Sequence, residues 1–577
     1  MYQKFYSLLS GGDRLKITYN KLKKVAFAAL ALPSIIFVLG FLRWYIGIPI
    51  ALLITTAYIF ALRNTKTEMA SDKEEKSITV PIWSILAIFG ISIAWCYFGG
   101  LGNLWYQSDD WSARNAIFRD LISHDWPVIY ASKNSALVYY IGFWLPPALI
   151  GKGVFSVFGN LNAAFFVGNI FLWLWSAFCI VIAFLLTALF INANNKKKLF
   201  IALSVFILFS GLDIVGSLYN LLVKDIGIGN HIEWWSTYYQ FSSMTTMLFW
   251  VFNQSIMTWL TVACFINEKT TRNYAFLVVL CAAGGPIPCV GIAVYMIGLA
   301  FYKLYKAIRA KEAKRFWLDV FTPQNLIPTL TVFPVYFLYY KTNLAVNVGK
   351  EIQTVRQAVD VRAVVVLAIT LCAVAAMTFI CKKQKKTWGE WLSLAIINAI
   401  FLVAVICEPS IRINYVFAIL LEGIVFLIPL WNAYKRSPIF HTTLFLIMLS
   451  PTIRIGTAGD FCMRASIPAI FVLMALCLQY LFNNSAKIFT RVNKDRSMLI
   501  TKISCWALVI CISIGAVTPF IEFKRGFGEV ISNKSIVLVN DSTYTFDQIF
   551  YGNRKNLDRN FIAENYNETF FFRYLAK

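Results

Sequence analysis

Long apolar runs recur along most of the chain and are separated by short polar segments. An α-helix needs roughly 20 apolar residues to cross a bilayer, and most of the runs approach that length. The predicted spans lie near 25–42, 45–62, 80–99, 164–191, 199–218, 246–266, 324–340, 361–381, 391–407, 415–431, 439–450, 467–483 and 499–518. The pattern therefore predicts an all-α polytopic membrane protein with about 13 full spans.

One further apolar segment is interrupted at Gly284–Pro288, which contains two glycines and two prolines. We expect a broken hairpin there, with halves at 274–283 and 289–302 that are too short for full crossings. The break would loosen helix packing. The run 137–157 also contains Pro146, Pro147 and Lys152, so we expect it to lie in the membrane interface and return to the same side.

Basic residues indicate which side of the membrane each loop faces, because cytoplasmic loops are enriched in Lys and Arg. The predicted topology places every basic segment on one side, together with the N-terminus: 63–76, 303–315, 382–386, 435–436 and 487–496. We therefore expect a cytoplasmic N-terminus, an exterior loop at 100–163 and an exterior tail at 522–577. The tail is too short and polar to bury a core of its own, and Phe570, Phe571, Phe572 and Tyr574 are its expected anchors.

The composition agrees with a membrane protein. Of the 577 residues, 59% are hydrophobic and only 14% are charged, which excludes an ordinary soluble domain. The net charge of +24 is explained by the basic loops, so nucleic-acid binding is disfavoured. The twelve cysteines fall mostly inside apolar runs and are typical of small core residues, not of a disulfide frame or a metal site.

Unusual polar residues collect on the predicted exterior side, in three groups. The first is Asp109 and Asp110, which follow the third span. Ser108 is a candidate N-cap for an interfacial helix whose first turn holds the two acids. The acids either serve chemistry or only complement the helix dipole.

The second group contains Asp213 at the end of an apolar run and the segment His231–Trp235. An acid in such a position is costly without a partner or a task. Trp234 and Trp235 are either interfacial aromatics or faces on which a sugar ring stacks, beside His231 and Glu233. A zinc site is disfavoured because this segment offers too few ligands.

The third group brings Arg412, Arg454 and Arg464 to the exterior, against the positive-inside trend. Arginine at an apolar boundary suits a phosphate or diphosphate. Alternatively, Arg412 pairs with Glu408 and Arg464 with Asp460 as structural ion pairs. Glu422, inside a predicted span, is a candidate partner for one of these cations.

An acidic pair after an early span, an interfacial helix and the Tyr139-Tyr140-x-x-x-Trp144-x-Pro146 segment together resemble the GT-C superfamily of membrane glycosyltransferases. The blocks 210–216, 231–235 and 460–468 look like segments of bacterial membrane proteins, so a bacterial plasma membrane is expected. The chain departs from the family by an extra N-terminal hairpin of two spans. It also lacks the large exterior domain of oligosaccharyltransferases.

The resemblance implies a sugar donor linked to polyprenyl phosphate and an acceptor hydroxyl in the cell envelope, on a glycan, lipid or protein. Asp109 or Asp110 would be the general base of an inverting transfer. Arg412, Arg454 and Arg464 would stabilise the departing phosphate. Substrate would also contact Asp213, His231, Glu233, Trp234, Trp235 and Asp460. In a metal-assisted version, the Asp pair would hold Mg²⁺ or Mn²⁺.

Four parts are expected. Residues 1–79 form a cytoplasmic segment with the extra hairpin, 80–323 the catalytic core, 324–521 a C-terminal bundle and 522–577 the tail. Two alternatives stay open: a transporter or flippase of lipid-linked glycans, since such proteins also hold intramembrane acids, and a glycan polymerase or ligase. A carrier should place its key charges near mid-membrane in two related halves, and no internal repeat is visible here.

Overall fold

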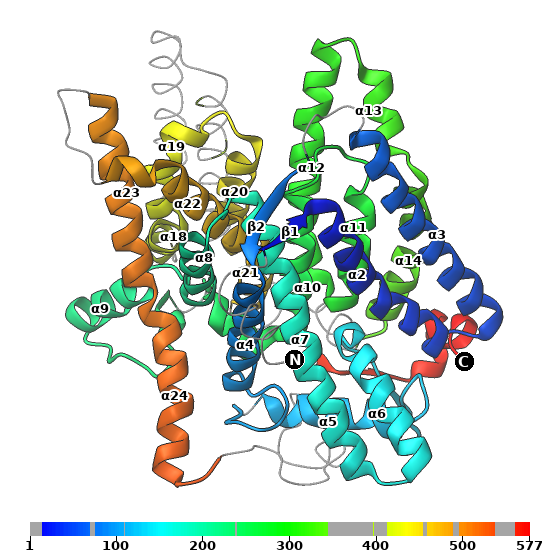
Figure 1. Cartoon of the computed structure of the whole chain (residues 1–577). Coiled ribbons are helices and arrows are strands. Elements are labelled where there is room, and N and C mark those ends of the chain that lie inside the picture. Colours follow the sequence, from blue (N-terminus) through cyan, green and yellow to red (C-terminus); the bar gives the residue numbers. More distant parts are fainter. Residues whose placement is uncertain are drawn as a thin grey trace, which may run out of the picture.

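The computed structural model describes residues 14–69, 75–108, 110–236, 239–343, 412–453, 459–488, 496–536 and 560–577, together with Glu390 and Ile396. The described chain is mostly helical (Figure 1). Its first helices are α2 (Tyr19–Phe41), α3 (Trp44–Met69), α4 (Ile82–Phe98), α5 (Trp111–Ser123), α6 (Leu145–Phe158), α7 (Leu161–Phe190), α8 (Lys196–Leu208), α9 (Asp213–Lys224) and α10 (Met244–Phe265). The later helices are α11 (Tyr274–Cys281), α12 (Pro286–Arg309), α13 (Ala313–Val320), α14 (Pro323–Lys341), α18 (Arg412–Ile419), α19 (Val425–Tyr434), α20 (Pro438–Leu449), α21 (Asp460–Ala465), α22 (Ile467–Ile488), α23 (Arg496–Gly515) and α24 (Val517–Asn533).

Nine helices of the described chain are long and apolar enough to cross a membrane, so this is an integral membrane protein. The predicted spans 361–381 and 391–407 lie outside the described residues, apart from Ile396. Two other predicted spans correspond to helices shorter than the roughly 20 residues of a typical crossing: α4 has 17 residues and α20 has 12. The segment 137–157 contains α6, whose 14 residues are also too few.

The prediction that both halves of the broken hairpin are short was wrong for the second half. Helix α12 begins at Pro286 and continues for 24 residues to Arg309. Proline is tolerated in a first helical turn because the N–H it lacks would be unpaired there anyway. Nor does the break loosen the packing. A Cβ on Gly284 would come within 3.0 Å of the Asn253 carbonyl oxygen, so the missing side chain lets the backbone lie close to α10.

Two small antiparallel sheets connect distant parts of the chain. Strand β1 (Arg14–Thr18) pairs with β2 (Ser77–Pro81), which joins the N-terminal segment to the loop before α4. Nearby, the buried Lys23 Nζ lies 2.8 Å from Glu268 Oε1 in the turn after α10. Three segments that are predicted to share one side of the membrane therefore lie together at one end of the bundle.

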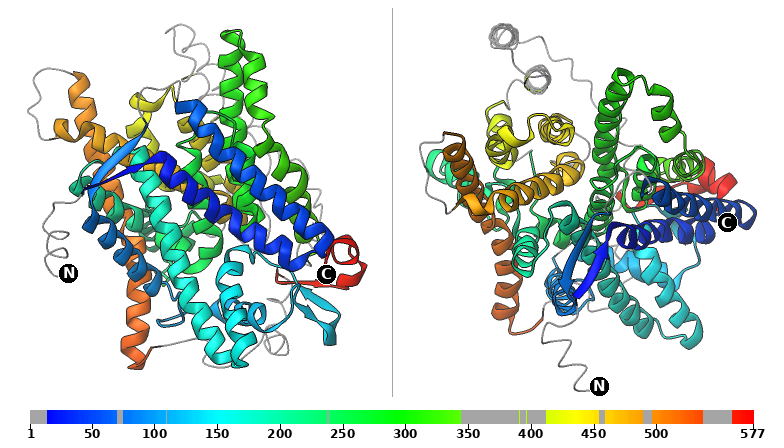
Figure 2. Two further views of the ribbon diagram at one scale, coloured as in Figure 1. Left: turned by 45° about the vertical axis from the view of Figure 1, so that its right-hand side comes forward. Right: turned by 45° about the horizontal axis from the view of Figure 1, so that its top comes forward.

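The second sheet lies at the other end and contains β3 (Ile129–Tyr130), β4 (Ser135–Leu137) and β5 (Ile562–Glu564). Because β5 pairs with β4, the C-terminal segment is joined to the loop between α4 and α7. The last residues then lie against the turn between α2 and α3 (Figure 2), where Arg43 donates to two of their carbonyl groups at 3.0 Å.

Only part of the prediction for the tail was right. Phe571 and Phe572 are buried and serve as anchors, whereas Phe570 and Tyr574 are 56% and 48% exposed. Residue 522 does not begin a polar tail either. Helix α24 continues to Asn533, and Glu522 within it is buried. The apolar run ends before the helix does. The helix continues because polar contacts stabilise its later turns.

Substitution of Arg43 by alanine should loosen the C-terminal segment. The guanidinium donates from Nε to the Ala576 carbonyl and from Nη2 to the Arg573 carbonyl. Loss of hydrogen bonds from a charged donor costs about 1.5 kcal/mol or more, which corresponds to roughly tenfold faster amide hydrogen exchange of residues 570–577. Arg63→Ala, an exposed arginine at the other end of the same helical hairpin, is the control. Equal exchange in both variants would contradict the assigned role.

Candidate functional site

Two groups of polar side chains lie near one another, on either side of Trp250. We call the first the arginine–tyrosine cluster: Asp110, Arg114, Tyr139, Tyr140, Asp460 and Arg464. We call the second the carboxylate–histidine cluster: Asp213, His231, Glu233, Glu422, Glu522 and Arg525. The ring of Tyr139 contacts that of Phe561 in the C-terminal segment, with centroids 4.6 Å apart, so the first cluster adjoins this segment.

Asp110 and Arg114 form an ion pair across the first turn of α5, with Oδ2 and Nη2 3.1 Å apart. The helix begins at Trp111, so Asp110 occupies the N-cap position that was predicted for Ser108. Its side chain makes no capping hydrogen bond, because the guanidinium one turn later engages the carboxylate. The carboxylate is 51% exposed. Asp109 lies outside the described residues.

Asp460 and Arg464 repeat this arrangement on α21, with Oδ1 and Nη1 2.8 Å apart. The ion pair considered as the alternative role of Arg464 is therefore present. The buried Nε of Arg464 has no hydrogen-bond partner among the described residues. Arg454 and the side chain of Arg412 lie outside the described part of the chain.

Tyr139 and Tyr140 lie between the two ion pairs. Burial raises the pKa of Tyr139 to about 12, and the charges of Arg464 and Arg114 act against this rise. Burial likewise raises the pKa of Tyr140, opposed by the Arg464 charge. Both hydroxyl groups therefore stay protonated at neutral pH. Two guanidinium groups and two phenol donors in one place suit an anionic ligand.

Trp250 connects the two clusters. Helix α10 is interrupted at Val251, whose φ and ψ are −141° and 38°, and this interruption leaves nearby carbonyl groups without helical partners. Arg114 donates to the carbonyls of Phe249, at 3.4 Å, and of Trp250. The indole Nε1 of Trp250 donates to Glu522 at 3.0 Å. One residue thus contacts a cation of the first cluster and an acid of the second.

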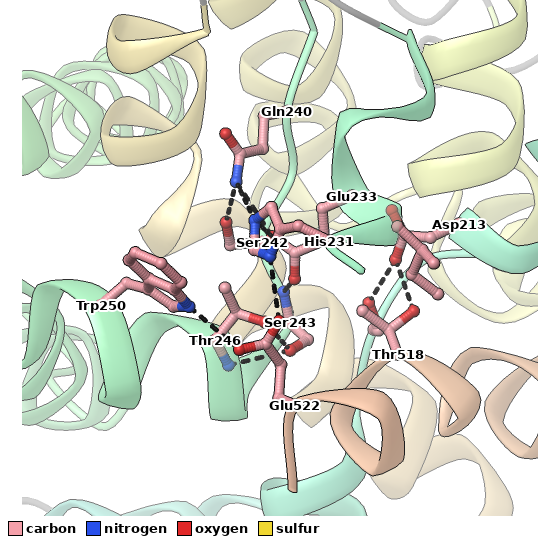
Figure 3. A network of polar contacts seen from close by, with 12 residues as sticks. Asp213, His231, Glu233, Gln240, Ser242, Ser243, Thr246, Trp250, Thr518 and Glu522 are labelled. Atoms are coloured by element: carbon pink, nitrogen blue, oxygen red, sulfur yellow. Dashed lines mark hydrogen bonds and ion pairs between the residues drawn. The ribbon is translucent and has the colours of Figure 1, made fainter. Parts of the chain in front are cut away.

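His231 is the centre of the second cluster (Figure 3). Its Nδ1 lies 2.9 Å from Glu522 Oε1, and its Nε2 lies 3.9 Å from Glu233 Oε2. Glu522 also accepts from Arg525 at 2.6 Å. Burial alone would lower the pKa of His231, but the hydrogen bond to Glu522 and the charge of Glu233 outweigh it, and the pKa is raised.

Glu233 is buried and accepts hydrogen bonds from the Ser243 amide at 2.8 Å and from Gln240 Nε2 at 3.0 Å. Burial raises its pKa to about 7, against the opposing charge of His231. Near neutral pH, the pair formed by Glu233 and His231 therefore gains or loses one proton easily.

The side chains of Asp213 and Glu422 are both buried and lie next to each other. Asp213 accepts from Ser210 Oγ and Thr518 Oγ1, both at 2.8 Å. Glu422 lies in the π-turn η6 (Leu420–Ile424), where the Leu421 carbonyl accepts from the Leu212 amide at 3.2 Å. A Cβ on Gly211 would overlap the Glu422 carboxylate, so this glycine is what allows the close approach.

Pairing of Glu422 with Arg412 or Arg454 stays a prediction, because those side chains lie outside the described part of the chain. The Glu422 carboxylate accepts from Trp235 Nε1 at 3.0 Å and faces Asp213, because the π-turn directs it toward the start of α9. The contact of Trp235 with a sugar stays a prediction, and the two tryptophans lie in different surroundings. The ring of Trp235 is buried and packs on Gly216, whereas Trp234 is 64% exposed.

Helix α9 has the reverse of the burial pattern found in a helix of a soluble protein. Its inward residues are polar or small: Asp213, Gly216, Ser217 and Asn220. Its outward residues are apolar, with Leu222 80% and Val223 64% exposed. It lies at the edge of the bundle beside α23 and α24 (Figure 1). This pattern is typical of a helix whose outer face meets lipid.

The break between α11 and α12 lies against α10. Gly285 has a φ of 141°, a value open to glycine, and an added Cβ would lie 3.3 Å from Gln254 Cγ. The buried side-chain amide of Gln254 has no hydrogen-bond partner among the described residues. Its neighbour Asn253 donates to the Tyr140 carbonyl at 3.1 Å, which ties this stretch of α10 to the arginine–tyrosine cluster.

Of the predicted site residues, the structure brings together Asp110, Asp460 and Arg464 in one cluster and Asp213, His231 and Glu233 in the other. Sequence reasoning missed Arg114, Trp250, Glu522 and Arg525. An exterior arginine in the otherwise apolar face of α5 was an available signal for Arg114. No local signal points to Glu522, which lies 291 residues from its partner His231.

In the described part of the chain, no three His, Cys, Asp or Glu side chains are close enough to hold a metal ion together. The proposed Mg²⁺ or Mn²⁺ site on Asp109 and Asp110 includes a residue outside that part. No family model, no curated protein and no solved structure matches this chain.

The stability of the protein should decrease as the pH rises from about 4.5 toward 7. The folded state holds a proton on Glu233, whose pKa is about 7, whereas the unfolded chain releases it near the ordinary value of 4.5. The contribution of this proton to stability is thus fully present below pH 4.5 and is lost as the pH rises through 7. Thermal unfolding of the purified protein in detergent at a series of pH values measures the decline.

In Glu233→Gln the decline over this range should be clearly smaller, because the amide does not titrate. Glu529→Gln, on the exposed side of α24, is the matched control and should follow the native protein. If Glu233→Gln and the native protein lose stability in parallel, Glu233 is not the group that holds the proton.

Proposed function

We propose that this protein is a membrane glycosyltransferase that moves a sugar from a polyprenyl-phosphate donor to an acceptor hydroxyl of the cell envelope. The observation that carries the proposal is the arginine–tyrosine cluster. Two guanidinium groups, each paired with an aspartate, lie close to two neutral phenols. A phosphate leaving a sugar gains negative charge, and preformed donors of this kind stabilise such charge.

The acid that takes the acceptor proton is Asp109 or Asp110 in this proposal. Asp110 is half exposed beside Arg114, so its carboxylate is accessible to an acceptor. Transfer forms the bond between the acceptor oxygen and the anomeric carbon, while the bond to the phosphate oxygen breaks. The charge that develops on that oxygen would be met by Arg464 and Arg114. Trp234, exposed beside His231, would offer its face to a sugar ring.

A transporter or flippase of lipid-linked glycans is the second candidate. It is favoured by Asp213 and Glu422, which are buried within helices long enough to cross a membrane. Against it stands the proximity of both acids to Glu233, in the cluster that Trp250 connects to the arginine–tyrosine cluster. A glycan polymerase or ligase would use the same groups with a larger donor.

Purified protein incubated with a polyprenyl-phosphate sugar and a glycan acceptor should release polyprenyl phosphate. Arg464→Gln should lower the rate about 10²–10³-fold, because a preorganised donor to the leaving phosphate is lost. Of Asp109→Asn and Asp110→Asn, the one that removes the base should lower it about 10²–10⁴-fold.

Asp225→Asn is the control, because Asp225 is exposed and its φ of 53° also suits asparagine. Unchanged turnover in both Asp109→Asn and Asp110→Asn would end the assignment of the base. Passage of an intact lipid-linked glycan across a vesicle membrane without release of polyprenyl phosphate would favour the transporter.

A further inference from the structure

His231 has the geometry of an oriented acid–base group. Its Nδ1 is held 2.9 Å from Glu522 Oε1. Its Nε2 makes only a long contact of 3.5 Å with Gln240 and lies 3.9 Å from Glu233. One ring nitrogen is therefore fixed by a carboxylate, and the other is left for a proton that can be exchanged with a ligand.

The ring is positioned by groups from several elements. Glu522 is on α24, Glu233 is in η3 (Ile232–Ser236), and the rings of Trp234 and Trp250 lie 4.8 and 5.5 Å away, centroid to centroid. The side chain is 11% exposed. A histidine held this way loses little freedom when it acts, which is what a catalytic group requires.

The charged groups that face His231 favour its protonated form. Glu522 and Glu233 are acids, and Arg525, paired with Glu522, opposes them. Asp213 and Glu422 are the next titratable groups beyond Glu233. The balance raises the pKa of His231, so the imidazolium persists to a higher pH than in an isolated histidine.

The cation also lies near the place proposed for the leaving phosphate. His231 contacts Trp250, and the Trp250 carbonyl accepts from Arg114 of the arginine–tyrosine cluster. The guanidinium of Arg525 lies over the same indole, 4.7 Å from its centroid. Three cationic side chains thus surround one tryptophan.

We propose that His231, oriented by Glu522, is the general acid that protonates the leaving phosphate; this inference rests on the proposed function. The acceptor hydroxyl gives its proton to the aspartate base and bonds to the anomeric carbon. The bond from that carbon to the phosphate oxygen breaks, and its electron pair stays on the oxygen. That oxygen takes the proton of His231 Nε2, and His231 is reprotonated from water.

The test is the pH dependence of polyprenyl-phosphate release in the native protein, His231→Gln, Glu522→Gln and the control Glu529→Gln. The native rate should fall on the alkaline side, as His231 loses its proton. His231→Gln should be about 10²–10⁴-fold slower and should lack this alkaline limb. Glu522→Gln removes the carboxylate that favours the imidazolium, so its alkaline limb should move by about one pH unit or more to lower pH.

Thermal unfolding and equilibrium binding of the donor are measured on each variant. A folded, donor-binding His231→Gln that keeps the native alkaline limb would overturn the inference and leave the proposed function intact. If Glu522→Gln folds and its limb does not move, the orienting role of Glu522 is overturned. Absence of release by the native protein from every polyprenyl-phosphate sugar tried would instead refute the proposed function.

Discussion

The interruption of α10 at Val251 is the constraint on which the candidate site depends. A continuous helix would satisfy the carbonyls of Phe249 and Trp250 internally and leave no acceptors for the buried guanidinium of Arg114. The interruption supplies those acceptors, and it orients the Trp250 indole toward Glu522. Ser255 helps to stabilise the distorted turn by donating to the Met247 carbonyl at 3.0 Å.

Charge burial explains why the polar residues are grouped instead of scattered. A single buried carboxylate is unfavourable, and removal of one partner from a buried ion pair costs about 3–5 kcal/mol. The carboxylate–histidine cluster avoids that cost by sharing donors: Glu522 alone receives hydrogen bonds from His231, Trp250 and Arg525. Asp213 is supplied by two hydroxyl groups from separate elements. The sharing is incomplete, because Asp213 Oδ1 and Glu422 Oε2 are buried without a hydrogen-bond partner among the described residues.

The lipid environment determines the shape of the surrounding elements. Helix α9 can turn a polar face inward and leucine outward only because its surroundings are apolar. The C-terminal segment is attached differently, by strand pairing with β4 and by the Arg43 contacts to its carbonyl groups. Helix α9 contributes Asp213 to the carboxylate–histidine cluster, and the C-terminal segment contacts Tyr139 of the arginine–tyrosine cluster.

The sequence by itself determined the membrane character, the helical class and most of the residues that collect at one end, because each of these follows from local apolar length and from polar residues that interrupt it. It also indicated the pairing of Asp460 with Arg464, which are one helical turn apart. Tertiary structure alone decided that His231 meets Glu522, that Glu422 meets Asp213, and that Trp235 is buried while Trp234 is exposed. Those outcomes depend on a π-turn, a distorted helix and two glycines that permit close approach between segments hundreds of residues apart, and periodicity along the chain carries no information about such encounters.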